Sequence, residues 1–172
     1  ILMAAAGALG AREYHGLTPD GPLAFGWLGA ALSGALPLIA ALQSDYRAFA
    51  LWAFALVLAT ALLALALSLW LRWPDGRPLD AASRTIMGAL YTGGALSFWV
   101  LLRALPDQVS TEATAFHGAA LLIFPIWVTW LGDTFAYGFG SRWGRVKLIA
   151  AVSPNKTVVG AIGGLGGSVM AG

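Results

Sequence analysis

Long apolar runs separated by short polar breaks dominate the sequence. Five breaks divide the chain into six apolar segments whose lengths suit membrane spans, which need about 20 apolar residues each. The third segment is the clearest, because residues 48–71 contain no charged side chain. The segments cover residues 1–11, 23–42, 48–71, 86–102, 115–131 and a run from residue 158 to the end of the chain.

This pattern predicts an all-α fold, a polytopic transmembrane helical bundle of about six apolar segments. The first and last segments are expected to be incomplete, because the chain begins and ends inside apolar runs. We divide the chain into residues 1–132, which form the N-terminal helices of the bundle, and residues 133–157, a loop at the cytoplasmic face that carries the candidate chemistry. Residues 158–172 are expected to start a further transmembrane helix.

Composition supports a membrane environment and excludes several functions. Hydrophobic residues make up 59% of the 172 positions and charged residues only 10%, whereas a soluble domain carries roughly 25% charged residues. The absence of cysteine excludes disulfides and thiolate metal sites. A net charge of +2 provides no broad surface for nucleic acid, so no nucleic-acid partner is expected.

The basic residues predict the orientation in the membrane. If every segment spans, the third and fifth polar breaks lie on the same side, and cytoplasmic loops are the ones enriched in Lys and Arg. We therefore expect Arg77 and Arg145 to face the cytoplasm, and Asp45 and Asp107 to face the opposite side. Seven of the ten basic residues lie in or beside these two breaks: Arg72, Arg77, Arg84, Arg142, Arg145, Lys147 and Lys156.

Asp133 is the first candidate for chemistry, because it lies at the end of the fifth apolar segment. An unpaired carboxylate is costly at the edge of a membrane, so such residues are functional candidates by default. The alternative is a carboxylate that reaches the interface or caps a following turn. The sequence alone leaves both interpretations open.

Glycines and basic residues alternate after Asp133. Glycines allow backbone N–H groups to approach an anion, and basic side chains supply charge, so the pattern suits a di- or triphosphate. The alternative is a basic loop that orients the protein or contacts anionic lipid headgroups. The residues concerned are Gly138, Gly140, Arg142, Gly144, Arg145 and Lys147.

The segment 153–157, Ser-Pro-Asn-Lys-Thr, leads into the last apolar run. Lys156 and Thr157 lie at the predicted helix start, where free N–H groups favour phosphate. An ordinary N-terminal cap before a membrane span is the alternative. Beyond it, the pairs Gly160/Gly164 and Gly163/Gly167 have the four-residue spacing that allows close helix packing in membranes.

These two motifs together resemble a known family. The run D-T-F-A-Y-G-F-G-S-R-W-G-R from Asp133, followed nine residues after Gly144 by S-P-N-K-T, resembles the cytoplasmic loop of phosphatidate cytidylyltransferases (CDP-diacylglycerol synthases). The run from Gly88 to Arg103 is also similar to the span before that loop. The sequence departs from the family at Val159, where Glu is usual, and at Ala150, where Pro is common.

The resemblance implies an enzyme of phospholipid biosynthesis that joins CTP and phosphatidic acid to give CDP-diacylglycerol and pyrophosphate, with Mg²⁺ as the divalent metal. It also implies a bacterial inner membrane location, with the lipid bilayer as a partner and the site facing the cytoplasm. The family's C-terminal acidic signature is absent before residue 172, so we expect this part of the enzyme to be inactive by itself. A homodimer is left open, as are three rival functions: a CTP-dependent lipid kinase, a CDP-archaeol synthase and a membrane transporter.

The resemblance also assigns roles to particular residues. Asp133 and Lys156 are the expected catalytic residues, and Asp133 is expected to hold the metal directly or through water, or to orient a basic side chain. His15 and His117 are isolated, and we interpret both as interfacial or packing residues rather than ligands. The residues expected to bind substrate through phosphate contacts or hydrogen bonds are Tyr137, Arg142, Arg145, Lys147, Ser153, Asn155 and Thr157.

Overall fold

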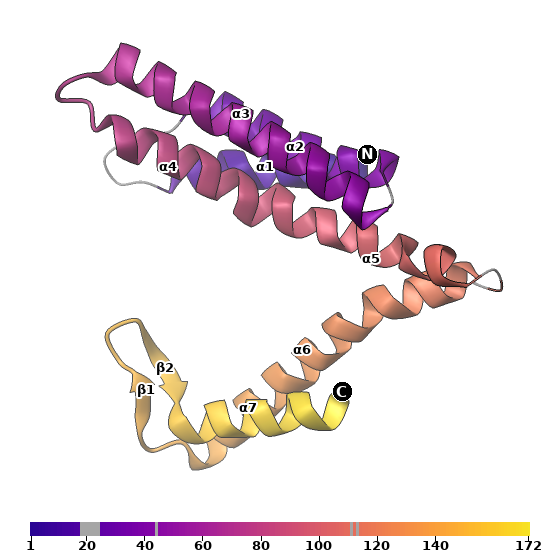
Figure 1. The fold of residues 1–172 in the computed structure, drawn as a ribbon. Coiled ribbons are helices and arrows are strands. Elements are labelled where there is room, and N and C mark those ends of the chain that lie inside the picture. The colour runs from indigo at the N-terminus through magenta and orange to yellow at the C-terminus, as the bar shows by residue number, and fades with distance from the viewer. Residues whose placement is uncertain (18–24, 44, 111, 113) are drawn as a thin grey trace. The chain divides into compact units, whose positions relative to one another are not determined.

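The computed structural model describes residues 1–17, 25–43, 45–110, 112 and 114–172. The chain forms two compact units, Ile1–Thr114 and Ala115–Gly172 (Figure 1). The described residues of the first unit form helices and their connections, and the second unit contains a helical pair with a small β-hairpin between its members. The elements are α1 (Leu2–Gly16), α2 (Gly26–Leu42), α3 (Tyr46–Arg72), α4 (Pro78–Ala89), the π-helix η1 (Leu90–Gly94), α5 (Ala95–Val109), α6 (Ala115–Trp143), β1 (Lys147–Ile149), β2 (Ser153–Thr157) and α7 (Val158–Ala171).

The predicted all-α membrane class is confirmed. Helices α4, η1 and α5 run without a break, so the described residues form six helical stretches. Three of these are long and apolar enough to cross a membrane: α3, the stretch Pro78–Val109, and α6. Helices α2 and α7 are apolar but shorter. The predicted second segment began at residue 23, and its first two residues lie outside the described part of the chain.

Helix α3 shows how the sequence builds a span. The carboxylate of Asp45 caps it by accepting a hydrogen bond of 2.9 Å from the Ala48 amide, which satisfies one of the free N–H groups at the helix start. Its 27 residues extend about 40 Å at 1.5 Å per residue, which exceeds the roughly 30 Å hydrocarbon core. Large side chains such as Leu51 and Phe54 are exposed in the protein and suit contact with lipid.

Helix α2 forms the centre of the first unit and contacts α1, α3, α4, η1 and α5. It buries Leu28, Leu32 and Leu36, which repeat every four residues and therefore share one face. On another side, the Ser33 and Thr92 hydroxyls share a hydrogen bond of 2.7 Å. A side chain at Gly93 would overlap the Ser33 backbone. The close approach of α2 to η1 therefore requires glycine at that position.

The second unit is built on α6 and α7, which pack side by side (Figure 1). The predicted close packing through small residues is confirmed. A Cβ added at Gly164 would lie 2.9 Å from the Ala136 Cβ and 3.1 Å from the Gly132 carbonyl oxygen. A Cβ added at Gly160 would lie 2.9 Å from the Ala136 carbonyl oxygen. The glycines thus let the two backbones touch, as is common between membrane helices.

Several predicted boundaries differ from the structure: the first helix ends at Gly16 rather than at residue 11, and the fourth helical stretch ends at Val109 rather than at residue 102. The fourth helical stretch begins at Pro78 rather than at residue 86. Helix α6 continues to Trp143 rather than ending near residue 131, so the first eleven residues of the predicted loop 133–157 are helical. The rest of that segment contains the β-hairpin, in which β1 and β2 are antiparallel. Gly138 and Gly140 favoured the prediction of a loop, but packing against α7 stabilises the helix in this stretch.

Candidate functional site

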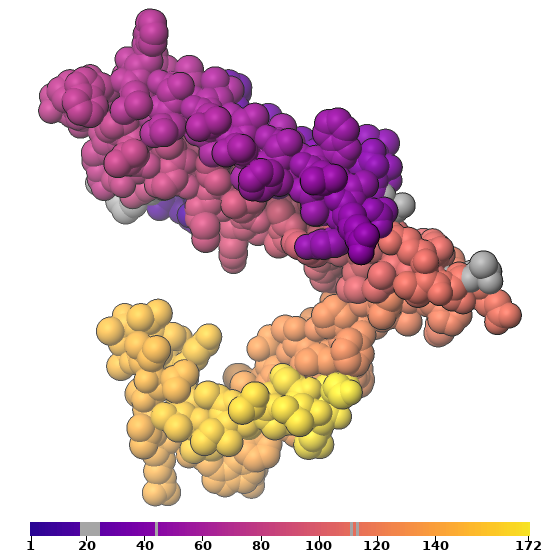
Figure 2. All heavy atoms as spheres, in the orientation of Figure 1, coloured from indigo at the N-terminus to yellow at the C-terminus, as the bar shows by residue number. Residues whose placement is uncertain are grey.

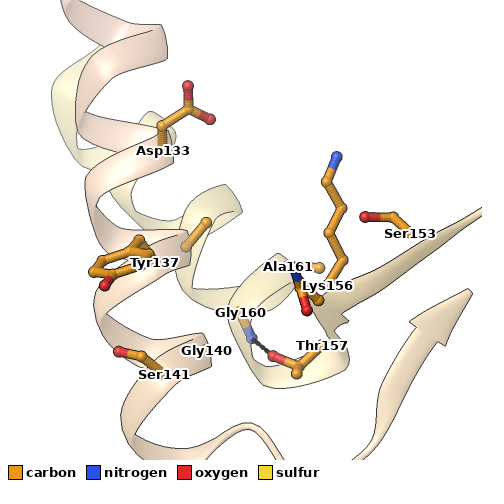
Figure 3. A pocket seen from close by; sticks show the side chains of 11 residues that line it. Asp133, Tyr137, Gly140, Ser141, Ser153, Lys156, Thr157, Gly160 and Ala161 are labelled. Carbon is orange, nitrogen blue, oxygen red and sulfur yellow. Dashed lines mark hydrogen bonds between the residues drawn. The ribbon is translucent and has the colours of Figure 1, made fainter. Parts of the chain in front are cut away.

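A pocket of about 630 Å³ lies in the second unit, where α6, β2 and the start of α7 meet (Figure 3). Its polar side chains come from two sequence regions, α6 and β2, which the fold of this unit brings together. The lining residues are Asp133, Ala136, Tyr137, Gly140, Ser141, Ser153, Asn155, Lys156, Thr157, Gly160 and Ala161.

Helix α6 contributes a polar row to this pocket. Asp133, Tyr137 and Ser141 are spaced four residues apart, and residues at this spacing lie on one face of a helix. All three are exposed. The row exists only because residues 133–143 are helical, since an irregular loop would not align these side chains.

Strand β2 contributes the basic residue of the pocket. Neighbouring residues of a regular strand point to opposite faces, yet both Asn155 and Lys156 line the pocket. The pairing of the two strands is irregular, because Lys147 pairs with Thr157 while Ile149 pairs with Ser153. A bulge of this kind re-aims side chains, which explains how two successive residues reach the same space.

Thr157 ties the strand to α7. Its side chain is buried, and its hydroxyl accepts a hydrogen bond of 3.1 Å from the Gly160 amide, which caps the helix. A Cβ added at Gly140 would lie 3.1 Å from this hydroxyl oxygen. Gly140 and Gly144, which the sequence analysis interpreted as glycines that let an anion approach, also make room for Thr157. Thr157 itself acts as the cap of α7 in this structure.

The two charged residues of the pocket face a shared space. The Asp133 carboxylate and the Lys156 ammonium both point into the gap between α6 and β2, and the Ser153 hydroxyl points toward Lys156 (Figure 3). Within the described part of the chain, neither charged side chain forms a hydrogen bond or ion pair with the protein. The N-terminus of α7, which carries the positive end of the helix dipole, is adjacent. The pocket can therefore bind a negatively charged group beside a carboxylate.

The structure brings six of the predicted site residues into this pocket and leaves three outside its lining. Asp133, Tyr137, Ser153, Asn155, Lys156 and Thr157 line it. The other three are exposed and do not line it: Arg142, Arg145 and Lys147.

Arg142 lies over the Trp143 ring, with its guanidinium carbon 5.5 Å from the ring centroid. Ser141 is a lining residue that the sequence analysis did not single out. Its signal was the four-residue spacing from Tyr137, which has meaning only on a helix.

The pocket offers few ligands for a metal ion. Asp133 is the one carboxylate among its lining residues, and no group of three or more His, Cys, Asp or Glu side chains that could hold a metal occurs in residues 1–17, 25–43, 45–110, 112 and 114–172. Mg²⁺ commonly uses one or two carboxylates together with substrate phosphates and water. The donor set therefore fits Mg²⁺ held jointly with a phosphate, but not a metal site made by protein side chains alone.

Helix lengths, apolar surfaces and this pocket define a polytopic helical membrane protein with a polar site at the end of a helical hairpin. A comparison with protein-family models identifies the family: the model described as the Cytidylyltransferase family matches residues 1–172. The chain therefore belongs to the cytidylyltransferase family.

Curated relatives agree with this assignment. The chain is 48% identical to a phosphatidate cytidylyltransferase of Staphylococcus saprophyticus over 52 residues, which are 30% of this chain and 20% of that protein. It is 44% identical to a phosphatidate cytidylyltransferase of Chlamydia trachomatis over 93 residues, which are 54% of this chain and 30% of that protein. The chain thus spans less than a third of the length of these relatives. No solved structure matches it.

Proposed function

We propose that this chain is part of a membrane-embedded nucleotidyltransferase that joins CTP and phosphatidic acid to give CDP-diacylglycerol and pyrophosphate. Family membership supports a cytidylyltransferase, and relatives with that printed name support phosphatidate as the lipid substrate. The observation that carries the proposal is the pocket itself, where Lys156 and Asp133 lie without protein partners beside the start of α7.

Lys156 supplies the positive charge for phosphate oxygens in this proposal. Its ammonium points into the pocket, and charge-assisted hydrogen bonds to phosphate are stronger than neutral ones. The Ser153 hydroxyl and the Asn155 amide can add hydrogen bonds from the same strand. The start of α7 favours an anion through its helix dipole. These groups position the polyphosphate of CTP.

Asp133 serves as the ligand for Mg²⁺ in this proposal, together with phosphate oxygens of the substrate. When bound, Mg²⁺ neutralises charge on the phosphates. Asp133 lies on the helix that faces Lys156 across the pocket, so the carboxylate and the ammonium can hold the two sides of one polyphosphate.

The reaction requires positioning rather than a protein nucleophile. An oxygen of the lipid phosphate attacks the α-phosphorus of CTP and forms a new P–O bond. The bond from the α-phosphorus to the bridging oxygen breaks, and pyrophosphate leaves with the electron pair. Transfers of this kind depend on orientation and on stabilisation of charge. A site on a membrane-spanning hairpin suits a reaction between a lipid and a water-soluble nucleotide.

The proposal also includes location and assembly. The positive-inside rule and the bacterial relatives support the inner membrane, with the pocket facing the cytoplasm, where CTP is available. A homodimer is the assembly to be tested, by crosslinking of the full-length protein in its native membrane.

The test uses the purified full-length protein in nanodiscs, with phosphatidic acid, Mg²⁺ and CTP labelled on the α-phosphate. We expect label in the lipid fraction as CDP-diacylglycerol, with one pyrophosphate released for each lipid formed. Asp133→Asn should abolish most of this product, while His117→Ala, far along α6 from the pocket, should not. Release of CDP with formation of a phosphorylated lipid would instead identify a CTP-dependent lipid kinase.

A further inference from the structure

The β-hairpin between α6 and α7 has an unusual distribution of side chains. Strand β2 presents its polar residues to the pocket, whereas β1 and the turn are exposed and, apart from Lys147, apolar. We call this exposed part the apolar edge. It consists of Val146, Leu148, Ile149 and Val152, whose exposed fractions are 64%, 44%, 56% and 81%.

The residue types in the turn of the hairpin are unusual for a turn that is exposed to water. Its residues are Ile149, Ala150, Ala151 and Val152, and the Val152 amide bonds to the Ile149 carbonyl at 3.2 Å. Hairpin turns in water are normally built from Gly, Asn, Asp, Pro or Ser. An apolar turn that the described residues of its own unit leave exposed indicates contact with something other than water.

The attachment of the hairpin keeps this edge close to the end of α6, a helix long and apolar enough to cross a membrane. Helix α6 ends at Trp143, three residues before Val146, and α7 begins directly after β2. The Val158 amide bonds to the Val146 carbonyl at 3.0 Å, which closes the base of the hairpin onto α7. Five strand residues span about 17 Å, so the turn stays within that distance of a membrane helix. The hairpin projects from the ends of both helices (Figure 2).

The charged residues near the hairpin indicate which kind of surface the apolar edge contacts. From residue 134 to residue 172 the chain contains four basic residues and no Asp or Glu. Two of these, Arg145 and Lys147, flank or interrupt the apolar edge and do not line the pocket. Trp143 precedes them, and Trp favours the membrane–water interface. Apolar side chains beside basic ones are typical of segments that lie in an anionic lipid interface.

We propose that the apolar edge docks into the anionic lipid headgroup layer beside the pocket, with Arg145 and Lys147 on lipid phosphates. The partner is the phospholipid leaflet that surrounds α6. This docking rests on the membrane-spanning fold and does not depend on the reaction proposed above. It assigns Arg145 and Lys147 to the lipid surface instead of to the bound nucleotide.

The test places an environment-sensitive fluorophore (NBD) on a single cysteine introduced as Val152→Cys in the full-length protein, with any other cysteine replaced. The matched control is Asn155→Cys on the opposite, pocket-facing strand. Nanodiscs contain phosphatidylcholine alone or with phosphatidylglycerol, and some carry doxyl-labelled lipid as a quencher. Lipid quenching should be several-fold stronger at position 152 than at 155, and iodide quenching correspondingly weaker.

Charge dependence provides the second measurement. Replacing Arg145 and Lys147 together by Gln should remove the increase in lipid quenching that phosphatidylglycerol causes at position 152. A label at 152 that iodide quenches fully in every lipid would overturn the proposal. A label protected from both iodide and doxyl lipid would also overturn it, because the apolar edge would then be covered by protein.

Discussion

Replacing Gly160 by alanine is expected to push α6 and α7 apart, because this glycine lies where the two backbones touch. The new Cβ would lie 2.9 Å from the Ala136 carbonyl oxygen and 3.2 Å from the Gly140 Cα. Both are backbone atoms, which cannot move aside by a change of rotamer. Relief therefore requires a shift of α6 itself, which also carries the polar row of the pocket.

The expected change in stability is the difference between two opposing contributions. Alanine stabilises a helix interior by roughly 0.5–1 kcal/mol relative to glycine, whereas an extra methyl group in a filled contact costs about 1–3 kcal/mol. At the middle of these ranges, about 2 kcal/mol of cost against about 0.75 kcal/mol of gain, Gly160→Ala should lower stability by about 1 kcal/mol. Gly166, on the same helix, has open space around its added Cβ. Gly166→Ala should leave stability unchanged or raise it slightly.

The measurement is the thermal unfolding midpoint of the purified full-length variants in one detergent, followed by the loss of monodisperse protein on size exclusion. The midpoint should fall for Gly160→Ala and not for Gly166→Ala. Product formation should fall with the first variant as well, because Gly160 lines the pocket. Equal midpoints for the two variants would refute the tight contact between α6 and α7.

Three further predictions concern charge, topology and the buried polar contacts of the first unit. Lys156→Ala should lower CDP-diacylglycerol formation about tenfold or more, because a hydrogen bond to a charged group contributes about 1.5–3 kcal/mol and about 1.4 kcal/mol is a factor of ten. Lys156→Arg should restore the rate only in part, because the planar guanidinium of arginine places its N–H donors differently from the ammonium of lysine. A normal rate for the Ala variant would contradict the proposed role of Lys156. Cysteines at Arg77 and Arg145 should react with an impermeant reagent from the same, cytoplasmic side in intact and opened cells; reaction from opposite sides would contradict the number of spans. Thr85→Val should destabilise the protein by about 1–3 kcal/mol, because the Thr85 hydroxyl accepts a buried hydrogen bond of 2.9 Å from the Phe25 amide at the start of α2. Ser83→Ala, which removes an exposed hydroxyl, should not change the unfolding midpoint.

The fold class was predictable because hydrophobicity is a property of single residues and the bilayer imposes a minimum length. The uncharged run 48–71 predicts a span, and α3 covers it from Tyr46 to Arg72. The pairing of α6 with α7 was also predictable in kind, because Gly160 and Gly164 show the small-residue spacing of close membrane helices. The hydrophobic run and the glycine spacing each involve residues that are close in the sequence, so both can be recognised without knowledge of the tertiary structure.

The helical state of residues 133–143 could not be inferred from local preference. Gly138 and Gly140 lower helix propensity, and the sequence therefore predicted a loop from Asp133 onward. In the structure this stretch packs against α7, and the glycine at 140 makes room for Thr157 and Gly160. Tertiary contact outweighs propensity here.

Tertiary structure decided which of the predicted site residues meet in the pocket. The sequence predicted that all four basic residues of the motif belong to the site, but in the structure Lys156 lines the pocket and Arg142, Arg145 and Lys147 do not. Asp133 and Lys156 are separated by more than twenty residues, and they face one space because α7 folds back along α6. Hydropathy and motif spacing describe positions along the chain, whereas a site depends on which positions the packed backbones bring together.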